Sequence, residues 1–505
     1  MSQYILAIDL GTTGITVLIL APDGHLRGRG YSEFRQYYPQ PGWIEHDGEE
    51  IWQTALSVMQ QALQQVGCQA GDIACLGITN QRETTLIWDR KSGKPVNKAL
   101  VWQDRRTASL CQQLKQEGLE PLWHQKTGLR IDPYFSATKI HWILAQQPEL
   151  RAQAENECLA FGTMDCWLIW KLSGGRCHAT DYSNVSRTLL YNIHQLCWDD
   201  DILARLAIPA ALLPEVKPSS GIMTYTDPAC FFGHEIPISG VAGDQHAALF
   251  GQTCFQPGQL KNTYGTGSFL LMNTGREAVT SQQGLLTTIA WRIGDEPVEY
   301  ALEGSVFVTG AAIQWLRDGL GLITSAAETA TMAQSLVSND DVYFVPALTG
   351  LGVPYWDPYA RGLLIGLTRG TTRNHLVRAA LESIAYQTRD VAQLMGRESG
   401  IPITTVRADG GAVVNDFLMQ FQADLLGATI EIPTLEETTA LGAGYLAGLG
   451  SGLWKNRDEL VDHWQLKKRY HPRMAAEEAN RLYARWQRAV ELSRNWARPT
   501  EPDPA

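Results

Sequence analysis

The sequence predicts an α/β protein built from two related domains, and three observations lead to this prediction. The chain has 505 residues, which is more than one hydrophobic core usually organises. Residues 4–20 consist of an apolar run, a Gly/Thr turn at Gly11–Gly14 and a second apolar run. Residues 260–273 repeat this order around Gly265-Thr266-Gly267. We therefore predict a duplicated α/β fold, with one domain in residues 1–250 and a second in residues 251–505.

The N-terminal half begins with three expected strands, at 4–10, 15–20 and 26–34, and Pro22-Asp23-Gly24 favours a hairpin before the third. Apolar residues at helical spacing predict a helix over 49–66. The strand expected at 73–79 precedes a polar quartet, Asn80-Gln81-Arg82-Glu83, which would lie at a sheet end where ligands commonly bind. A short strand at 99–103 and helices from about 105 and over 137–147 follow.

The C-terminal half has the same composition of elements. Strands are expected at 260–264, 269–273, 284–293, 297–303 and 406–408. Helices are expected from about 310 and over 375–395, 415–426, 438–449 and 476–495, with Asn374 as the N-cap of the second.

The bulk composition excludes several classes of protein. The net charge of −11 argues against nucleic acid as a partner, because phosphate backbones need a basic surface. No apolar run reaches 18 residues, so no membrane span is predicted, and the first residues lack the basic region of a signal peptide. All nine cysteines lie between Cys68 and Cys254 without a Cys-x-x-Cys pair, which favours a reducing cytoplasm.

The two Gly/Thr turns are candidate phosphate-binding loops. Glycine lets backbone N–H groups converge on an anion, and threonine hydroxyls donate further hydrogen bonds. Each turn taken alone is better explained as an ordinary hairpin turn, because glycine and threonine are common turn residues. Asp9, which directly precedes the first turn, favours the phosphate reading because a carboxylate there suits Mg²⁺ held through water.

Asp244 lies in a small-residue loop and is a candidate general base, which would accept a hydroxyl proton during phosphoryl transfer. The alternative is an ordinary N-cap or turn aspartate. His246, at the start of an apolar helix, is expected to be structural.

Arg82 and Glu83 together offer donors and acceptors for neighbouring hydroxyls of a polyol, unless they form only a surface ion pair. Trp102, Tyr134 and Phe269 would either wall such a pocket or belong to the core.

Several sequence blocks resemble the FGGY family of carbohydrate kinases, and within it the members that phosphorylate glycerol. The resemblance extends from about Tyr4 to the last helix. The blocks are Ile78-Thr-Asn-Gln-Arg-Glu-Thr-Thr85, Val101-Trp-Gln, Asp132-Pro-Tyr-Phe-Ser-Ala-Thr-Lys139, Gly243-Asp-Gln, Asn262-Thr-Tyr-Gly-Thr-Gly267, Pro354-Tyr-Trp-Asp-Pro-Tyr-Ala-Arg-Gly362 and Ala408-Asp-Gly-Gly-Ala412. The resemblance implies an actin/Hsp70-like (ribonuclease H-like) fold with ATP in the cleft between two α/β domains.

The resemblance also implies roles for particular residues. Asp244 matches the catalytic base and a metal-associated carboxylate, and Asp9 matches the carboxylate that holds Mg²⁺ through water. The positions that match glycerol-binding residues are Arg82, Glu83, Trp102, Tyr134, Asp244, Gln245 and Phe269. The positions that match nucleotide contacts are Thr12, Thr13, Gly14, Thr266, Gly267, Gly310, Gln314, Gly411 and Asn415.

Two segments depart from the pattern. Glycerol-phosphorylating members usually carry Asp-Gln-Gly-Thr-Thr-Ser-Ser-Arg at the first turn, whereas this chain has Gly14 for the first serine and Thr16 for the arginine. A cation near the phosphates is therefore missing, and either another group such as Lys261 replaces it or phosphoryl transfer is weaker. Residues 230–236 lack the Gly-Gly-x-Arg loop through which fructose 1,6-bisphosphate inhibits some bacterial members, so insensitivity to that effector is predicted.

The function that follows is ATP-dependent phosphorylation of glycerol to sn-glycerol 3-phosphate, in glycerol catabolism. The alternatives are a kinase for another small polyol or sugar, a catalytically weakened ATP-binding homologue, and an actin-like ATPase module that binds protein. The family resemblance also implies a homodimer or homotetramer.

Overall fold

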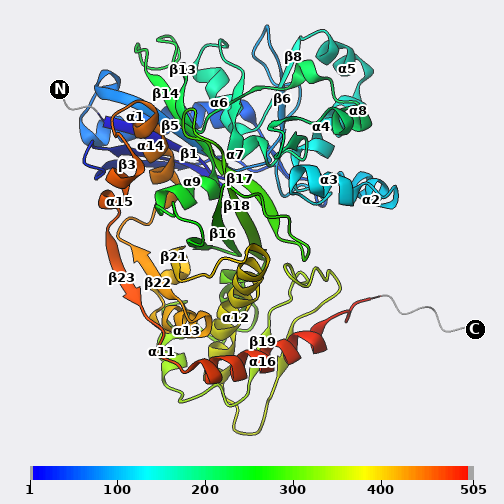
Figure 1. The fold of residues 1–505 in the computed structure, drawn as a ribbon, viewed down its shortest axis with the longest axis vertical. Helices are drawn as coiled ribbons and strands as arrows, with labels where there is room; N and C mark the ends of the chain where they lie inside the picture. Colours follow the sequence, from blue (N-terminus) through cyan, green and yellow to red (C-terminus); the bar gives the residue numbers. More distant parts are fainter. Residues whose placement is uncertain (1–3, 499–505) are drawn as a thin grey trace, which may run out of the picture.

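The computed structural model describes residues 4–498, and it forms two α/β domains, one above the other in Figure 1. The first three residues of the N-terminal stretch, where no signal peptide is predicted, lie outside this range. Within residues 4–498, no helix is both long and apolar enough to cross a bilayer. All nine cysteines are free thiols.

The N-terminal domain is built on a six-stranded sheet whose order is β13-β14-β5-β1-β2-β3. Strands β14, β5 and β1 are parallel to one another, and β2 and β3 follow β1 as an antiparallel meander. The bounds are β1 (Tyr4–Leu10), β2 (Gly14–Leu20), β3 (Leu26–Glu33), β5 (Ile73–Asn80), β13 (Ser220–Tyr225) and β14 (Pro237–Gly243). The apolar runs of the sequence therefore become the central strands, as expected for a sheet buried on both faces.

The C-terminal domain repeats this arrangement in a seven-stranded sheet of order β17-β18-β16-β15-β21-β22-β23. Strand β15 is parallel to β21, β21 is parallel to β22, and β16 and β18 form the antiparallel meander beside β15. The bounds are β15 (Leu260–Tyr264), β16 (Ser268–Gly275), β17 (Leu286–Trp291), β18 (Glu299–Val306), β21 (Thr405–Gly410), β22 (Thr429–Pro433) and β23 (Leu466–Tyr470). The predicted duplication and the ribonuclease H-like fold are confirmed.

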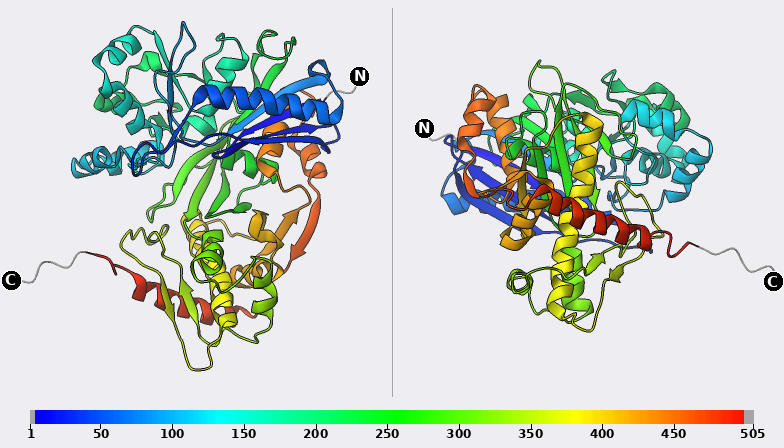
Figure 2. Two further views of the ribbon diagram at one scale, coloured as in Figure 1. Left: turned by 180° about the vertical axis from the view of Figure 1, so that it is seen from behind. Right: turned by 60° about the horizontal axis from the view of Figure 1, so that its bottom comes forward.

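Two helices cover the faces of the N-terminal sheet, and they come from opposite ends of the chain. Helix α1 (Gly48–Val66) packs on β2 and β3, and Figure 2 (left) shows it lying along the sheet. Helix α14 (Thr438–Gly450) packs on β1, β5 and β14, and α9 (Asp244–Gly251) packs on α14. The C-terminal part of the chain therefore returns to the N-terminal sheet, and the boundary between residues 250 and 251 stays a prediction.

A large insertion between β5 and β13 has a separate hydrophobic core. It contains β6 (Leu86–Asp89), β7 (Ala99–Leu100), α2 (Ala108–Gln116), α3 (Glu120–Thr127), α4 (Ser136–Gln146), α5 (Pro148–Glu155), β8 (Leu159–Gly162), α6 (Met164–Leu172), α7 (Tyr182–Val185) and α8 (Asp200–Leu206). In this insertion α7 packs beside β14, and Ser136 at the start of α4 donates to the carbonyl of Glu83, which follows β5.

Three helices pack around the C-terminal sheet. Helix α12 (Arg373–Ser399) is largely buried and contacts β16 and β18, α13 (Asp416–Leu426) contacts β22, and α16 (Ala476–Ser493), the red helix in Figure 2 (right), packs on α13. The N-cap predicted for α12 is wrong. Thr372 occupies that position, and its backbone N–H donates to His375 Nδ1 at 3.1 Å. Asn374 lies inside the helix and donates instead to Ser335.

Candidate active site

Three parallel strands place the predicted catalytic residues side by side. In the strand register Asp9 of β1 lies beside Thr79 of β5, and Thr79 lies beside Ala242 of β14. The residues that follow these strands therefore leave the same edge of the sheet. They include the quartet that ends in Arg82 and Glu83, and Asp244 at the start of α9. Ligands of open α/β sheets bind at such carboxyl ends.

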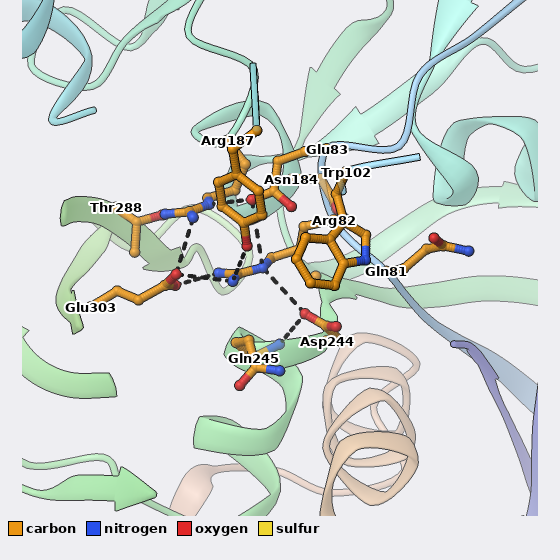
Figure 3. Close-up of polar contacts among 12 residues, drawn as sticks. Gln81, Arg82, Glu83, Trp102, Asn184, Arg187, Asp244, Gln245, Thr288 and Glu303 are labelled. Carbon is orange, nitrogen blue, oxygen red and sulfur yellow. Dashed lines mark hydrogen bonds and ion pairs between the residues drawn. The ribbon is translucent and has the colours of Figure 1, made fainter. Parts of the chain in front are cut away.

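Arg82 is the hub of a buried cluster of charges (Figure 3). Its two terminal nitrogens donate to the two carboxylate oxygens of Glu303, with Nη2 3.0 Å from Oε1. Its Nε lies 3.2 Å from Asp244 Oδ1. Arg187 bridges the two glutamates, donating to Glu83 Oε1 at 2.7 Å and to Glu303 Oε1 at 3.0 Å. Because these arginines and glutamates are at most 3% exposed, their mutual pairing is what makes burial of the charges tolerable.

Glu83 is held in an unusual backbone conformation. Its φ of 60° lies in the left-handed region, which a glutamate seldom adopts. Ser136 Oγ donates to its carbonyl at 2.9 Å, and Arg187 binds its carboxylate. Backbone strain that the surroundings enforce is common at functional sites, so the position of this carboxylate is a candidate functional feature.

An aromatic wall borders the charge cluster. The rings of Trp102 and Tyr134 meet edge to face with centroids 5.5 Å apart, and Arg82 NH2 lies 3.4 Å from the Tyr134 hydroxyl. Trp102 Nε1 also donates to Thr12 Oγ1 at 3.0 Å, which links the wall to the first Gly/Thr turn. Phe269 is half-buried on β16. The wall is therefore both apolar and connected to the predicted phosphate loop.

Lys139 fixes the loop that carries Tyr134. It is fully buried on α4, and its Nζ donates to the carbonyls of Pro133 at 2.5 Å and of Tyr134 at 2.8 Å. Burial lowers the pKa of Lys139 to about 8.

Asp244 has the surroundings of a base. Burial raises its pKa, and Arg82 and Lys261 partly oppose that shift. Lys261 is fully buried and donates to Gln245 Oε1 and, at 3.0 Å, to Thr263 Oγ1. Burial lowers the Lys261 pKa to about 8. His246 is buried, its Nε2 lies 3.0 Å from Thr288 Oγ1, and burial lowers its pKa, which fits the structural role predicted for it.

Asp9 fits a site for a cation. Within residues 4–498 its Oδ1 is buried and has no hydrogen-bond partner. Burial, then the charges of Asp244 and Glu437, raise its pKa to about 8. A nearby cation would relieve both effects. Among the described residues, no group of three or more histidines, cysteines, aspartates or glutamates is placed to hold a metal ion.

Both Gly/Thr turns are braced by neighbouring segments. Gln81 Nε2 donates to the Gly11 carbonyl and Gln36 Nε2 to the Thr12 carbonyl, both at 3.0 Å. In the second turn, the backbone N–H of Gly310 donates to the Gly265 carbonyl at 3.1 Å and that of Ala311 to the Thr266 carbonyl at 3.0 Å. Gly310 thus begins α10 (Gly310–Gln314) directly on the second turn. Thr13 and Thr266 are exposed, so both hydroxyls are accessible.

The remaining predicted nucleotide contacts lie farther into the C-terminal domain. Gln314 is exposed at the end of α10, and Gly411 borders open space after β21. Asn415 caps α13 through Leu418 N–H at 3.0 Å and donates to Thr329 Oγ1 at 3.0 Å. Its amide is therefore engaged within the protein, and a nucleotide contact through it stays a prediction.

Sequence reasoning missed three residues of the site: Arg187, Glu303 and Lys139. Arg187 and Glu303 come from segments with no recognisable motif, so only the fold shows that they meet Arg82 and Glu83. Lys139 lies inside a quoted block and carried a signal, since a lysine within an apolar helix needs a partner.

The sequence profiles of the FGGY family of carbohydrate kinases match both halves, the N-terminal domain at residues 4–251 and the C-terminal domain at residues 260–451. Glycerol kinase 2 of Thermotoga maritima and the glycerol kinase of Symbiobacterium thermophilum are each 58% identical, over 98% of this chain and 99% of their own. The crystal structure of Plasmodium falciparum glycerol kinase with ADP superposes with a TM-score of 0.93 at 34% identity, covering 97% of this chain and 98% of that one.

Proposed function

The chain belongs to the FGGY family of carbohydrate kinases, and we propose that it transfers the γ-phosphoryl group of ATP to a terminal hydroxyl of glycerol, giving sn-glycerol 3-phosphate. The observation that carries the proposal is the meeting of a buried Arg82–Glu83 pair, an aromatic wall and the carboxylate of Asp244 at one sheet edge. The relatives named glycerol kinase support the same substrates.

In the proposed mechanism Asp244 accepts the proton of the attacking hydroxyl, because its raised pKa makes it a stronger base than a surface aspartate. Arg82 donates to one neighbouring hydroxyl of glycerol and Glu83 accepts from another, while Trp102 and Phe269 contact the carbon chain. Gln245 and Tyr134 complete the acceptor pocket. Exclusion of water by these walls strengthens each of the polar interactions.

The nucleotide is proposed to bind between the two Gly/Thr turns. Thr12, Thr13 and Gly14 would donate to phosphate oxygens from one domain, and Thr266 and Gly267 from the other. Gly310, Gln314, Gly411 and Asn415 would border the rest of ATP. Mg²⁺, when bound, neutralises phosphate charge, and Asp9, through water, and Asp244 are the carboxylates that would hold it.

The decisive experiment measures ADP formation with glycerol and with a panel of other polyols and sugars, for the wild type and for Asp244→Asn. We expect turnover that depends on glycerol and falls roughly 10²- to 10⁴-fold in the variant. Equal turnover rates on several other polyols or sugars would favour the second candidate, a kinase for another small polyol or sugar. ATP hydrolysis indifferent to every acceptor would overturn the proposal.

Two further properties are proposed with the function. A homodimer or homotetramer is the expected assembly, which analytical ultracentrifugation would test, with a monomer at micromolar concentration as the contrary result. The nine free thiols suit a reducing compartment such as the cytoplasm, in keeping with a role in glycerol catabolism.

A further inference from the structure

The position at which an arginine is missing lies directly beside Asp9. In the sheet Asp9 is paired with Thr16 across β1 and β2, and Thr16 is paired with Tyr31 across β2 and β3. Paired residues of antiparallel strands project from the same face, so these three side chains form one row. Thr16 is only 7% exposed and carries no charge. The row therefore lacks a cation at its centre.

Arg29 lies on β3, two residues before Tyr31, and can supply a positive charge near this row. Gly28 and Gly30 of β3 face α1, because a Cβ at either position would collide with Val66 or Val58. Residues 29 and 31 must then project from the opposite face, on which the row of Asp9 lies. Tyr31 belongs to that row, and Arg29 pairs with Leu18 in the next row, farther from the turn. The Arg29 guanidinium lies 5.4 Å from the centre of the Tyr31 ring, which supports it over this face of the sheet.

Arg29 also reaches the carboxylate that is electrostatically coupled to Asp9. Its Nε donates to Glu437 Oε1 at 2.8 Å, just before the first residue of α14. The charge of Glu437 is one of the causes that raise the Asp9 pKa, after burial and Asp244. Within residues 4–498 the side-chain hydrogen bonds of Arg29 use only Nε, so both terminal nitrogens remain available as donors.

The second departure at the first turn fits the same arrangement. A Cβ at Gly14 would lie 2.8 Å from the Tyr31 hydroxyl and 2.8 Å from the Ser32 carbonyl. The tyrosine that supports Arg29 therefore packs against the phosphate turn at the point where a serine side chain is absent. Gly14, Tyr31 and Arg29 form a continuous contact from the turn to the cation.

We propose that Arg29 supplies the positive charge for the nucleotide phosphates that Thr16 does not, with Tyr31 as its support and Gly14 making room for that tyrosine. The inference rests on the proposed use of ATP at this cleft. Arg29 is thus the alternative to Lys261 as the substitute cation, because the Lys261 amine donates to Gln245 and Thr263 on the acceptor side. A terminal guanidinium on a half-exposed side chain can reorient toward phosphate without breaking a buried contact.

The test is nucleotide affinity, measured by isothermal titration calorimetry with ADP and without glycerol. We expect Arg29→Met to weaken binding roughly 10-fold or more, the loss of one charge-assisted contact. Arg27→Met is the matched control, since Arg27 lies on the same strand and, within residues 4–498, its side chain pairs only with Asp23 at the surface. The control should bind ADP as the wild type does, and the glycerol KM of Arg29→Met should stay within about twofold of wild type.

Two further variants separate a phosphate contact from a structural ion pair. If Arg29 serves only to pair with Glu437, then Glu437→Gln and Arg29→Met should weaken ADP binding alike. If Arg29 binds phosphate, Glu437→Gln should instead strengthen binding, because it frees the guanidinium and removes an anion beside Asp9. Thr16→Arg added to Arg29→Met should restore affinity, and Thr16→Arg alone should change it little.

Unchanged affinity in Arg29→Met, or equal losses in Arg29→Met and Glu437→Gln, would overturn the proposal. If the double variant Thr16→Arg/Arg29→Met does not fold, the measurements on Arg29→Met and Glu437→Gln still decide. Because the affinities are measured without an acceptor, a failure of glycerol phosphorylation would be recognised separately, by wild-type turnover, and would not be confused with a failure at Arg29.

Discussion

Asp9 and Asp409 are aspartates near the strand ends of the two related domains, and their surroundings differ. Asp409 Oδ2 accepts hydrogen bonds from Gln252 at 2.7 Å and from Thr438 at 2.6 Å. Asp9 Oδ1 has no partner among the described residues and has a pKa raised to about 8. A duplicated topology provides equivalent strand ends, whereas the donors that reach each carboxylate determine whether it is held within the fold or keeps an unpartnered oxygen.

The same division holds for the neighbouring positions. In register with the C-terminal sheet, Thr263 of β15 lies beside Asp409 of β21, just as Asp9 of β1 lies beside Thr79 of β5. Each pair contains one aspartate and one threonine, in opposite order. The N-terminal aspartate lies in the strand that leads into the first turn, and the C-terminal aspartate binds Thr438 at the start of α14. The C-terminal carboxylate therefore connects the two domains.

The largest expected effect comes from exchanging these two carboxylates for amides. We expect Asp9→Asn to lower kcat roughly 10²-fold or more, because electrostatic support of phosphoryl transfer is lost, while the folded protein persists. We expect Asp409→Asn to cost about 1–3 kcal/mol of stability through its two hydrogen bonds, with a smaller loss of kcat. Steady-state kinetics and chemical unfolding would measure both. Equal effects on kcat would remove the distinction between the two aspartates.

The dependence of stability on pH sharpens the same comparison. Because the folded-state pKa of Asp9 is about 8 against an ordinary value of 3.8, the folded protein binds one more proton than the unfolded chain between these values. The free energy of unfolding that this bound proton contributes therefore falls as the pH rises from about 4 toward about 8. Asp9→Asn should flatten that fall and raise the thermal midpoint of the ligand-free protein at pH 8. Parallel pH profiles for variant and wild type would contradict the assignment.

Sequence reasoning recovered what depends on local pattern. The strands of both meanders are visible because central strands are continuously apolar, and Asp9 and Asp244 are visible because each adjoins a small-residue turn. Arg187 and Glu303 could not be found in this way, since each is a single charged residue whose meaning depends on a partner more than 100 positions away. The N-cap of α12 was misplaced because threonine and asparagine compete closely for that position and a histidine side chain decided the outcome.

Glu303 is a residue of the C-terminal half that reaches the proposed acceptor site through its contacts with Arg82 and Arg187, so it tests how separate the two halves are. We expect Glu303→Gln to raise the KM for glycerol roughly 10-fold, since Arg82 loses its charged bidentate partner. The freed Arg82 should also pair more closely with Asp244 and lower the Asp244 pKa. The acidic limb of kcat/KM would then move to lower pH.

The matched control for this variant is Glu382→Gln. Glu382 is a buried glutamate of the same domain that pairs with Arg378 at 2.7 Å on α12, outside the acceptor site. It should leave the glycerol KM and the acidic limb unchanged even if it lowers stability. A similar KM for both variants, or a fixed acidic limb in Glu303→Gln, would assign Glu303 to folding alone.

Trp102→Phe should have a smaller effect, because it keeps an aromatic wall and removes only the hydrogen bond to Thr12. A neutral hydrogen bond contributes about 0.5–1.5 kcal/mol, which corresponds to a change of roughly 2- to 10-fold. The bond joins the acceptor wall to the first phosphate turn within one half. We therefore expect the KM values for glycerol and for ATP to rise together, which initial-rate measurements over both substrates would show. A rise for glycerol alone would mean that Thr12 is positioned independently.

The smallest expected effect is that of fructose 1,6-bisphosphate, which should not inhibit. Residues 230–236 lie between β13 and β14, and the segment enters β14 at its amino end, away from the strand ends that carry the chemistry. The segment has no arginine or lysine, and Phe231 anchors it in the core of the N-terminal sheet. A bisphosphate needs several converging cations, and this fixed segment supplies none of its own. Glycerol-dependent rates should therefore stay within about twofold of the control up to millimolar effector. Clear inhibition at that concentration would show that residues elsewhere in the protein provide the site.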